Sequence, residues 1–217
     1  MSENQNLKTE ENEIAERAET GVKKENLFAK KLKKRLSAKR LAFMGVFVAL
    51  SYVVSIFSFA LFPSSGVFFL ELDFGNVFIM LVSFLLGPVE GIVVCILKEG
   101  LHVLLNLKGG TGGVGELANA IMTSAFILIP SIVYQYRKGL KTVSFTLVIA
   151  CVVGTAVALL TNRLITFPLF LKESAVQVFE ENFWFILAFN LIKTVSISVV
   201  TILLYKRLSN LLKKMKI

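Results

Sequence analysis

Long apolar stretches separated by short polar segments run along this chain from Leu41 to Tyr205. An apolar run of about 20 residues crosses the hydrocarbon core of a bilayer, and in lipid the backbone must satisfy its own hydrogen bonds, as a helix does. The pattern therefore predicts an integral membrane protein built as an all-α bundle. Few ionisable residues interrupt the apolar stretches, chiefly Lys98, Glu99, His102 and Lys193.

The apolar runs and the turn residues between them predict six transmembrane helices. The first covers residues 41–62 and ends at the turn sequence Pro-Ser-Ser-Gly. The others are expected at residues 74–86, at 89–105, in a fourth segment that ends before Arg137, at 143–160 and at 183–205. Residues 67–73 are mostly apolar but too short to cross the membrane, so we expect them to fold back over the bundle. The whole external loop, residues 63–73, is expected to act as a lid. Residues 161–182 are expected to form an outer loop with an interfacial helix near residues 172–181.

The net charge of +9 is best explained by membrane topology. Basic residues gather before the first span (30–40), after the fourth (137–141) and after the last (206–216). By the positive-inside rule all three clusters are cytoplasmic, which places both termini inside and fits an even number of spans. Because the basic residues flank apolar spans and are not interleaved with exposed aromatic residues, the expected partner is membrane lipid and not nucleic acid.

Composition divides the chain into three parts. Residues 1–40 are polar and predict a disordered cytoplasmic tail with a basic juxtamembrane segment. Residues 41–206 form the six-helix membrane domain, and residues 207–217 form a basic cytoplasmic tail. The membrane domain leaves no room for an additional catalytic module.

The side chains of a membrane enzyme are missing from the sequence. His102 is the only histidine and Asp73 the only aspartate, which excludes an intramembrane metalloprotease and a protease with paired aspartates. Cys95 and Cys151 lie in apolar runs, so we expect two buried thiols and neither a disulfide nor a metal site. No enzymatic activity, no metal and no catalytic cofactor are expected.

A few polar residues within the spans favour a binding protein. Asn190 and Lys193 are three residues apart and share one helix face, and Lys193 lies too deep in its span to be an ordinary end anchor. We therefore expect both to contact a ligand. A glycine-dense stretch, residues 106–115, precedes Glu116 and Asn119, and its glycines serve either helix packing or close backbone approach to a ligand.

Other polar and small residues allow two interpretations each. Asn162 either meets water at a helix end or faces the ligand. Lys98, Glu99 and His102 cluster in the third span, where internal pairing is favoured over a direct functional role. The first span has small residues at close spacing that form a docking surface for another helix, of this chain or of a partner. These small residues are Ala42, Gly45 and Ala49.

Several motifs, in order, resemble the substrate-binding S component of an energy-coupling factor (ECF) transporter, specifically its riboflavin-binding RibU group. They are KRLAFMGVFVALSY (39–52), FLELDFGN (69–76), LGPVEG (86–91), Lys98-x-x-x-His102, GGVGELAN (112–119) and FNLIK (189–193). Gly75 and Asn76 depart from the Leu-x-Leu-Asp-Phe-Ser-Asp form usual in that group. This departure leaves room for another vitamin or a flavin nucleotide.

The resemblance implies a high-affinity binding subunit for vitamin uptake, with riboflavin as the transported ligand, in the bacterial plasma membrane. It implies a transmembrane scaffold subunit and two ATP-binding ATPase subunits as partners, with the small-residue surface of the first helix against the scaffold. The substrate-binding residues that it implies are Asn190, Lys193, Glu116, Asn119, Asn162 and Leu70. The alternatives are an S component for a different vitamin and a membrane protein with a structural role.

Overall fold

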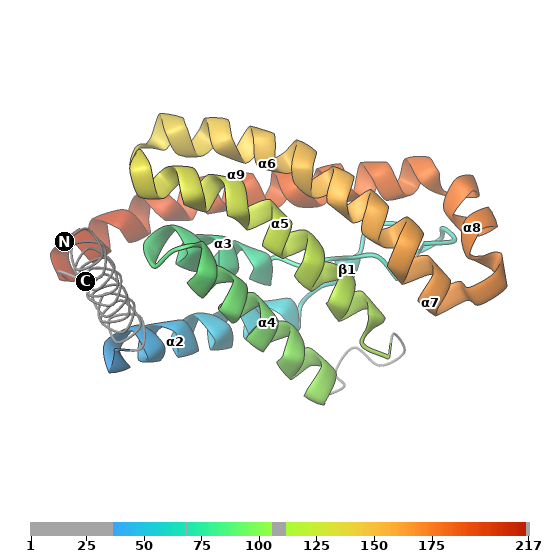
Figure 1. Cartoon of the computed structure of the whole chain (residues 1–217), viewed down its shortest axis with the longest axis horizontal. Coiled ribbons are helices and arrows are strands. Elements are labelled where there is room, and N and C mark those ends of the chain that lie inside the picture. Colours follow the sequence, from blue (N-terminus) through green and yellow to red (C-terminus); the bar gives the residue numbers. More distant parts are fainter. Residues whose placement is uncertain (1–36, 68, 106–111, 216–217) are drawn as a thin grey trace, which may run out of the picture. The chain divides into compact units, whose positions relative to one another are not determined.

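The computed structural model describes residues 37–67, 69–105 and 112–215 of the 217-residue chain (Figure 1). The predicted tail, residues 1–40, lies almost entirely outside the described residues, as does most of the glycine-dense stretch. The chain separates into two compact units, Met1–Phe43 and Met44–Ile217. In the first unit the described residues begin a helix, where the Leu41 amide donates to the Ser37 carbonyl oxygen at 3.0 Å. The second unit holds the helical bundle and its pocket.

Each of the six predicted spans falls on a helix. These helices are α2 (Ala38–Ser55), α3 (Gly75–Leu85), α4 (Pro88–Leu105), α5 (Val114–Tyr136), α6 (Leu140–Thr161) and α9 (Phe183–Met215). Four helical stretches are long and apolar enough to cross a membrane, namely Ala38–Ser55, Val114–Tyr136, Leu140–Glu181 and Phe183–Tyr205. α3 is apolar but shorter, and α4 carries three charged residues in its 18 positions. The predicted all-α membrane bundle is confirmed.

The turn between α3 and α4 forms at Gly87 and Pro88, as predicted. Gly87 has φ +130°, a conformation that glycine adopts without the steric cost of a Cβ. Pro88 is the first residue of α4, where its missing N–H removes no helical hydrogen bond. One turn further on, a Cβ at Gly91 would lie 2.5 Å from the Ser83 Cβ, so glycine allows α3 and α4 to approach closely.

The first helix is shorter than predicted. α2 ends at Ser55, and Phe59–Ala60 forms a strand, β1, that pairs antiparallel with β2, Glu71–Leu72. Ser55 Oγ donates to Asp73 Oδ1 at 2.5 Å, and Ser58 Oγ donates to Glu71 Oε2 at 2.6 Å. These hydrogen bonds draw the chain out of the helix, a tertiary effect that the apolar composition of residues 56–62 does not reveal.

The prediction of a loop for residues 161–182 is wrong for its first half, which is helical, whereas the helix expected near residues 172–181 is confirmed. The segment contains a π-helical turn η1 (Asn162–Thr166), α7 (Phe167–Leu171), a 3-10 turn η2 (Lys172–Ser174) and α8 (Ala175–Glu181). Pro168 lies in the first turn of α7, a position that tolerates proline. The chain reverses at Lys172, the one non-glycine residue with positive φ among the described residues.

A small apolar cluster joins these outer helices to the fold-back segment. Its buried members are Val67, Phe167, Ala175, Phe179 and Ile186. Val67 is 1% exposed, and Phe69 and Leu70 pack against the same cluster. The described residues of the 67–73 segment therefore do fold back over helical structure, as predicted. In the bundle, α5 packs against α3, α4 and α6, and α9 packs against α3 and α6. The start of α5, the end of α6 and the start of α9 lie at the end of the bundle that also carries α7 and α8 (Figure 1).

Candidate functional site

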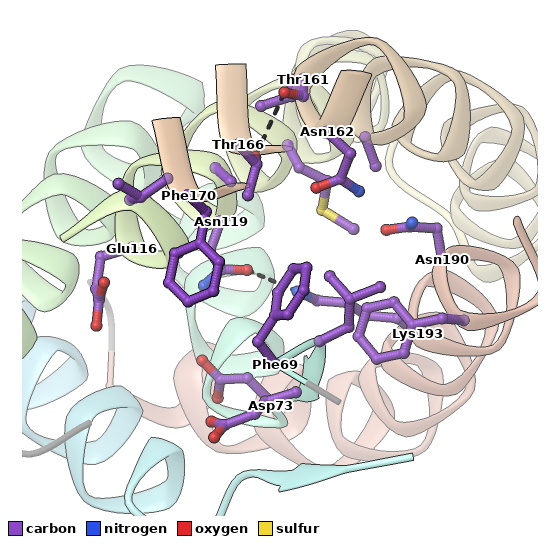
Figure 2. A pocket seen from close by; sticks show the side chains of 18 of the residues that line it. Phe69, Asp73, Glu116, Asn119, Thr161, Asn162, Thr166, Phe170, Asn190 and Lys193 are labelled. Carbon is purple, nitrogen blue, oxygen red and sulfur yellow. Dashed lines mark hydrogen bonds between the residues drawn. The ribbon is translucent and has the colours of Figure 1, made fainter. Parts of the chain in front are cut away.

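A cavity of about 450 Å³ lies at this end of the bundle (Figure 2). Its volume falls within the range of about 300–1,000 Å³ that is typical of small-molecule pockets. Five parts of the chain line it: residues 69–73 with β2, Glu99 of α4, the first turns of α5, the junction of α6 with η1 and α7, and α9. Segments far apart in the sequence therefore converge on one space.

Lys193 reaches into the pocket from α9, where its side chain is largely buried. Its Nζ donates to Asn119 Oδ1 on α5 at 2.8 Å. Asn76 Nδ2 on α3 donates to the same oxygen at 3.0 Å, and Asn119 Nδ2 donates to Glu99 Oε1 on α4. Asn119 thus connects the polar groups of α3, α4 and α9 at the pocket edge.

Two further asparagines face the pocket on its other side (Figure 2). Asn190 Nδ2 donates to the Ile186 carbonyl oxygen at 2.8 Å, which holds this side chain against its own helix. Asn162 is the first residue of the π-helical turn, and Thr166 Oγ1 within that turn donates to the Thr161 carbonyl oxygen at 3.4 Å. Single π-helical turns occur frequently at functional sites. This one brings the polar side chains of Asn162 and Thr166 to the pocket, next to Thr161 at the end of α6.

Three phenylalanine rings supply the apolar walls, those of Phe69, Phe170 and Phe189. The ring centroids of Phe69 and Phe170 are 5.1 Å apart. The Lys193 Nζ lies 5.8 Å from the centroid of the Phe189 ring. Flat apolar surfaces beside amide groups suit a planar ligand that carries hydrogen-bonding atoms along its edge.

Acidic side chains outnumber basic ones around the pocket. Its lining includes the carboxylates of Glu71, Asp73, Glu99 and Glu116. Lys193 is the single basic residue among the described lining residues. Behind the lining, the Lys98 Nζ contacts Asp73 Oδ2 at 2.5 Å and Glu99 Oε1 at 2.7 Å. The site therefore favours hydrogen-bond donors and neutral groups over anions.

The structure brings together all six residues that the sequence nominated for the substrate site. Asn190, Lys193, Glu116, Asn119, Asn162 and Leu70 line the same pocket. The three docking candidates, Ala42, Gly45 and Ala49, are exposed on α2 and do not line it. Their functional roles stay predictions.

The favoured interpretation of the third-span cluster is confirmed for its two charged members. Lys98 and Glu99 form an internal ion pair, with Asp73 as a third member. His102 packs its ring against Tyr52, with centroids 4.7 Å apart. Glu99 differs from Lys98 and His102 because it also lines the pocket.

Several pocket residues escaped the sequence reasoning. Asp73, Phe69, Phe170, Thr161 and Thr166 all line the cavity. The one available signal was Asp73, the single aspartate of the chain, placed directly before an apolar span. The others lie in segments predicted to be outer connections, and their convergence depends on the helical turns after α6 that the sequence did not predict.

Known proteins resemble this chain over most of its length. The family described as "ECF transporter, substrate-specific component" matches residues 39–205. Riboflavin transporter RibU of Staphylococcus aureus (strain TCH60) is 32% identical over 183 residues, which cover 81% of this chain and 93% of that protein. Riboflavin transporter FmnP of Bacillus subtilis (strain 168) is 25% identical over 184 residues, covering 80% and 93%. A solved structure of the S component of a bacterial ECF transporter matches with a TM-score of 0.67 and 34% identity, covering 81% of this chain and 98% of that chain.

Proposed function

The chain belongs to the family of ECF transporter substrate-specific components, and we propose that riboflavin is the vitamin that it binds. As a member of this family it is a multi-pass protein of the bacterial cell membrane and a transport subunit, not an enzyme. The observation that carries the riboflavin assignment is the 32% identity to a riboflavin transporter across 81% of the chain.

The chemistry of the pocket supports a flavin. The isoalloxazine ring is planar and largely apolar on its faces, which suits the rings of Phe69, Phe170 and Phe189. Its edge carries carbonyl and ring-nitrogen acceptors, and the Lys193 ammonium and the asparagine amides can donate to them. The hydroxyl groups of the ribityl chain are donors as well as acceptors, and carboxylates such as that of Glu116 accept from them.

Charge favours riboflavin over its phosphorylated form. A phosphate group would enter a space that is lined by four carboxylates and, among the described residues, by one basic side chain. The buried Lys98 balances one charge of the Asp73 and Glu99 pair, which leaves negative charge in excess. Like charges repel strongly where water is scarce, so a terminal phosphate weakens binding. The same argument disfavours vitamins that carry several carboxylates.

The family implies that this chain works with an ECF scaffold subunit and an ATPase module. We propose that the module has two ATPase subunits and that the small-residue surface of α2 docks on the scaffold. The chain then provides the vitamin site, and ATP hydrolysis by the partners drives uptake.

Fluorescence titration of the purified chain tests the proposal. Riboflavin added to the protein in nanodiscs should lose its fluorescence on binding, with flavin mononucleotide binding at least about tenfold more weakly, a difference of about 1.4 kcal/mol. Thiamine and biotin serve as controls and should not compete. Tight binding of one of these controls without riboflavin binding would instead support an S component for another vitamin, and binding of none of them would support a structural role.

A further inference from the structure

A lysine that is absent from the described pocket lining lies fully buried behind it. Lys98 is 0% exposed within α4. Its Nζ donates to Asp73 Oδ2 at 2.5 Å, to Glu99 Oε1 at 2.7 Å and to Asn76 Oδ1 at 3.5 Å. An ammonium group has three donor positions, so these three acceptors occupy all of them. A charge buried to this degree is tolerated only because it is paired and hydrogen-bonded.

Asp73 provides the first connection from Lys98 to the pocket. Its second oxygen, Oδ1, accepts from the Gly75 amide at 2.8 Å and from Ser55 Oγ at 2.5 Å. Asp73 follows β2 directly and itself lines the pocket. The contacts of Asp73 with α2 and α4 therefore fix the point at which the β1–β2 hairpin joins α3. They also fix the adjoining pocket wall, which includes Phe69.

Glu99 provides the second connection. Its Oε1 accepts from Lys98 and also from Asn119 Nδ2. Because a carboxylate offers only acceptors, the amide nitrogen of Asn119 faces Glu99, and the amide oxygen faces the Lys193 Nζ at 2.8 Å. The orientation of this pocket amide thus depends on a carboxylate that Lys98 holds in place.

We propose that Lys98 is a positioning residue for ligand binding. Its ammonium group keeps Asp73 and Glu99 side by side; through Asp73 it holds the hairpin wall over the pocket, and through Glu99 it directs Asn119 toward Lys193. Without the ammonium group the two carboxylates repel each other in a site of low dielectric, the hairpin wall relaxes outward and the ligand leaves faster. The identity of the ligand rests on the proposed function. The role of Lys98 in holding the hairpin wall does not depend on which ligand binds.

Three variants of the full chain test this role. Lys98→Met removes the charge and keeps the length of the side chain. Lys98→Met/Asp73→Asn removes one charge of each sign and leaves Glu99, still hydrogen-bonded to Asn119, as the one charged member of the network. It therefore avoids the two facing buried carboxylates that disfavour folding of the single variant. Tyr134→Phe is the matched control, because it removes a different buried hydrogen bond, that between Tyr134 and Tyr205, from residues outside the pocket lining.

Stopped-flow fluorescence measures the rate constant of riboflavin dissociation. We expect it to rise about tenfold or more in both Lys98 variants, because both lose the ammonium contacts that hold residue 73 and Glu99, and loss of a buried charge partner acts mainly on dissociation. Repulsion between the two carboxylates adds to this effect in Lys98→Met alone. In Tyr134→Phe it should stay within about twofold of the wild type even where the melting temperature falls. An unchanged dissociation rate in either folded Lys98 variant overturns the proposal.

Hydrogen exchange of the ligand-free proteins separates this proposal from the riboflavin assignment. The amides of the β1–β2 hairpin should exchange faster in Lys98→Met than in the wild type or in Tyr134→Phe. If the wild-type protein does not bind riboflavin, the proposed function fails while the exchange experiment still decides the role of Lys98. In that case faster hairpin exchange supports the positioning role and unchanged exchange overturns it.

Discussion

Asn119 is the residue at which the ligand pocket meets the buried ion-pair network. Its oxygen accepts from Lys193, and its nitrogen donates to Glu99. The Lys193 ammonium has three donor positions, so it can donate to a ligand while it keeps its hydrogen bond to Asn119. Asn119 therefore holds the ammonium in place, and the hydrogen bond to the ligand decides how much Lys193 contributes to affinity.

Replacing Lys193 by Met keeps the aliphatic stem and removes the donor. We expect the free energy of riboflavin binding to weaken by about 1.5–3 kcal/mol, the usual contribution of a hydrogen bond to a charged group, which corresponds to about 10- to 150-fold in Kd. Fluorescence titration measures the change, and Lys141→Met, at an exposed position near the start of α6, serves as the control. A Kd equal to that of the wild type in folded Lys193→Met would remove Lys193 from the site.

The sequence reveals a pocket residue when the pattern of its own helix is unusual at that position. Asn190 and Lys193 do so because their spacing and depth in an apolar span are unusual, and Asn119 and Glu116 because they continue a glycine-dense stretch. Asp73 gives a weaker signal, since one carboxylate before a span is compatible with a simple helix end. Phe170 gives none, because its place in the pocket depends on the π-helical turn and α7, which tertiary packing sets.

The same distinction holds for whole helices and strands. The predicted bounds of α3, α4 and the start of α9 lie within one residue of those observed, because Gly87, Pro88 and the polar residues before Phe183 mark them locally. The end of α2 was misplaced because residues 56–62 are apolar in either conformation. The hydrogen bonds that accompany the observed conformation, from Ser55 to Asp73 and from Ser58 to Glu71, have their acceptors more than ten residues further along the chain.

The loop of residues 63–73, which includes β2, is predicted to act as a lid. Residues 69–73 line the pocket, so a bound ligand adds contacts to this segment and should reduce its local opening. Limited proteolysis with a chymotrypsin-type enzyme should therefore cut between Ser64 and Leu72 more slowly when riboflavin is saturating.

Trypsin cleavage near Arg137 and Lys138, exposed residues between α5 and α6, provides an internal control and should not respond to riboflavin. Equal cleavage of the 64–72 segment with and without saturating ligand would count against a lid, provided that binding is seen under the same conditions.

Assembly with an ECF scaffold requires a surface that is separate from the pocket, and α2 offers one. Gly45 and Ala49 are exposed, do not line the cavity, and stand on the helix whose other side is buried through Met44, Phe47 and Val48. A Cβ added at Gly45 would meet no atom within 4 Å. Within the described residues, this position therefore has no internal packing that would require glycine, which favours contact with a partner helix over contact inside the chain.

Bulk at these two positions should separate vitamin binding from transport. In Gly45→Leu/Ala49→Leu the new side chains point away from the pocket lining, so the Kd for riboflavin of the isolated chain should stay within about twofold of the wild type. A partner helix that approaches closely over small residues is displaced by the added side chains, so co-purification with the scaffold and ATPase subunits, and uptake driven by ATP, should be lost. Val148→Leu/Val152→Leu adds bulk at two exposed positions of α6 and controls for changes that only affect contact with lipid. If the α2 variant still assembles and supports uptake, the scaffold docks elsewhere. If the α2 variant loses riboflavin binding while the α6 variant keeps it, α2 contributes to the pocket through its contacts with Asp73 and Gly75. In that case vitamin binding and scaffold docking are not separate functions of α2.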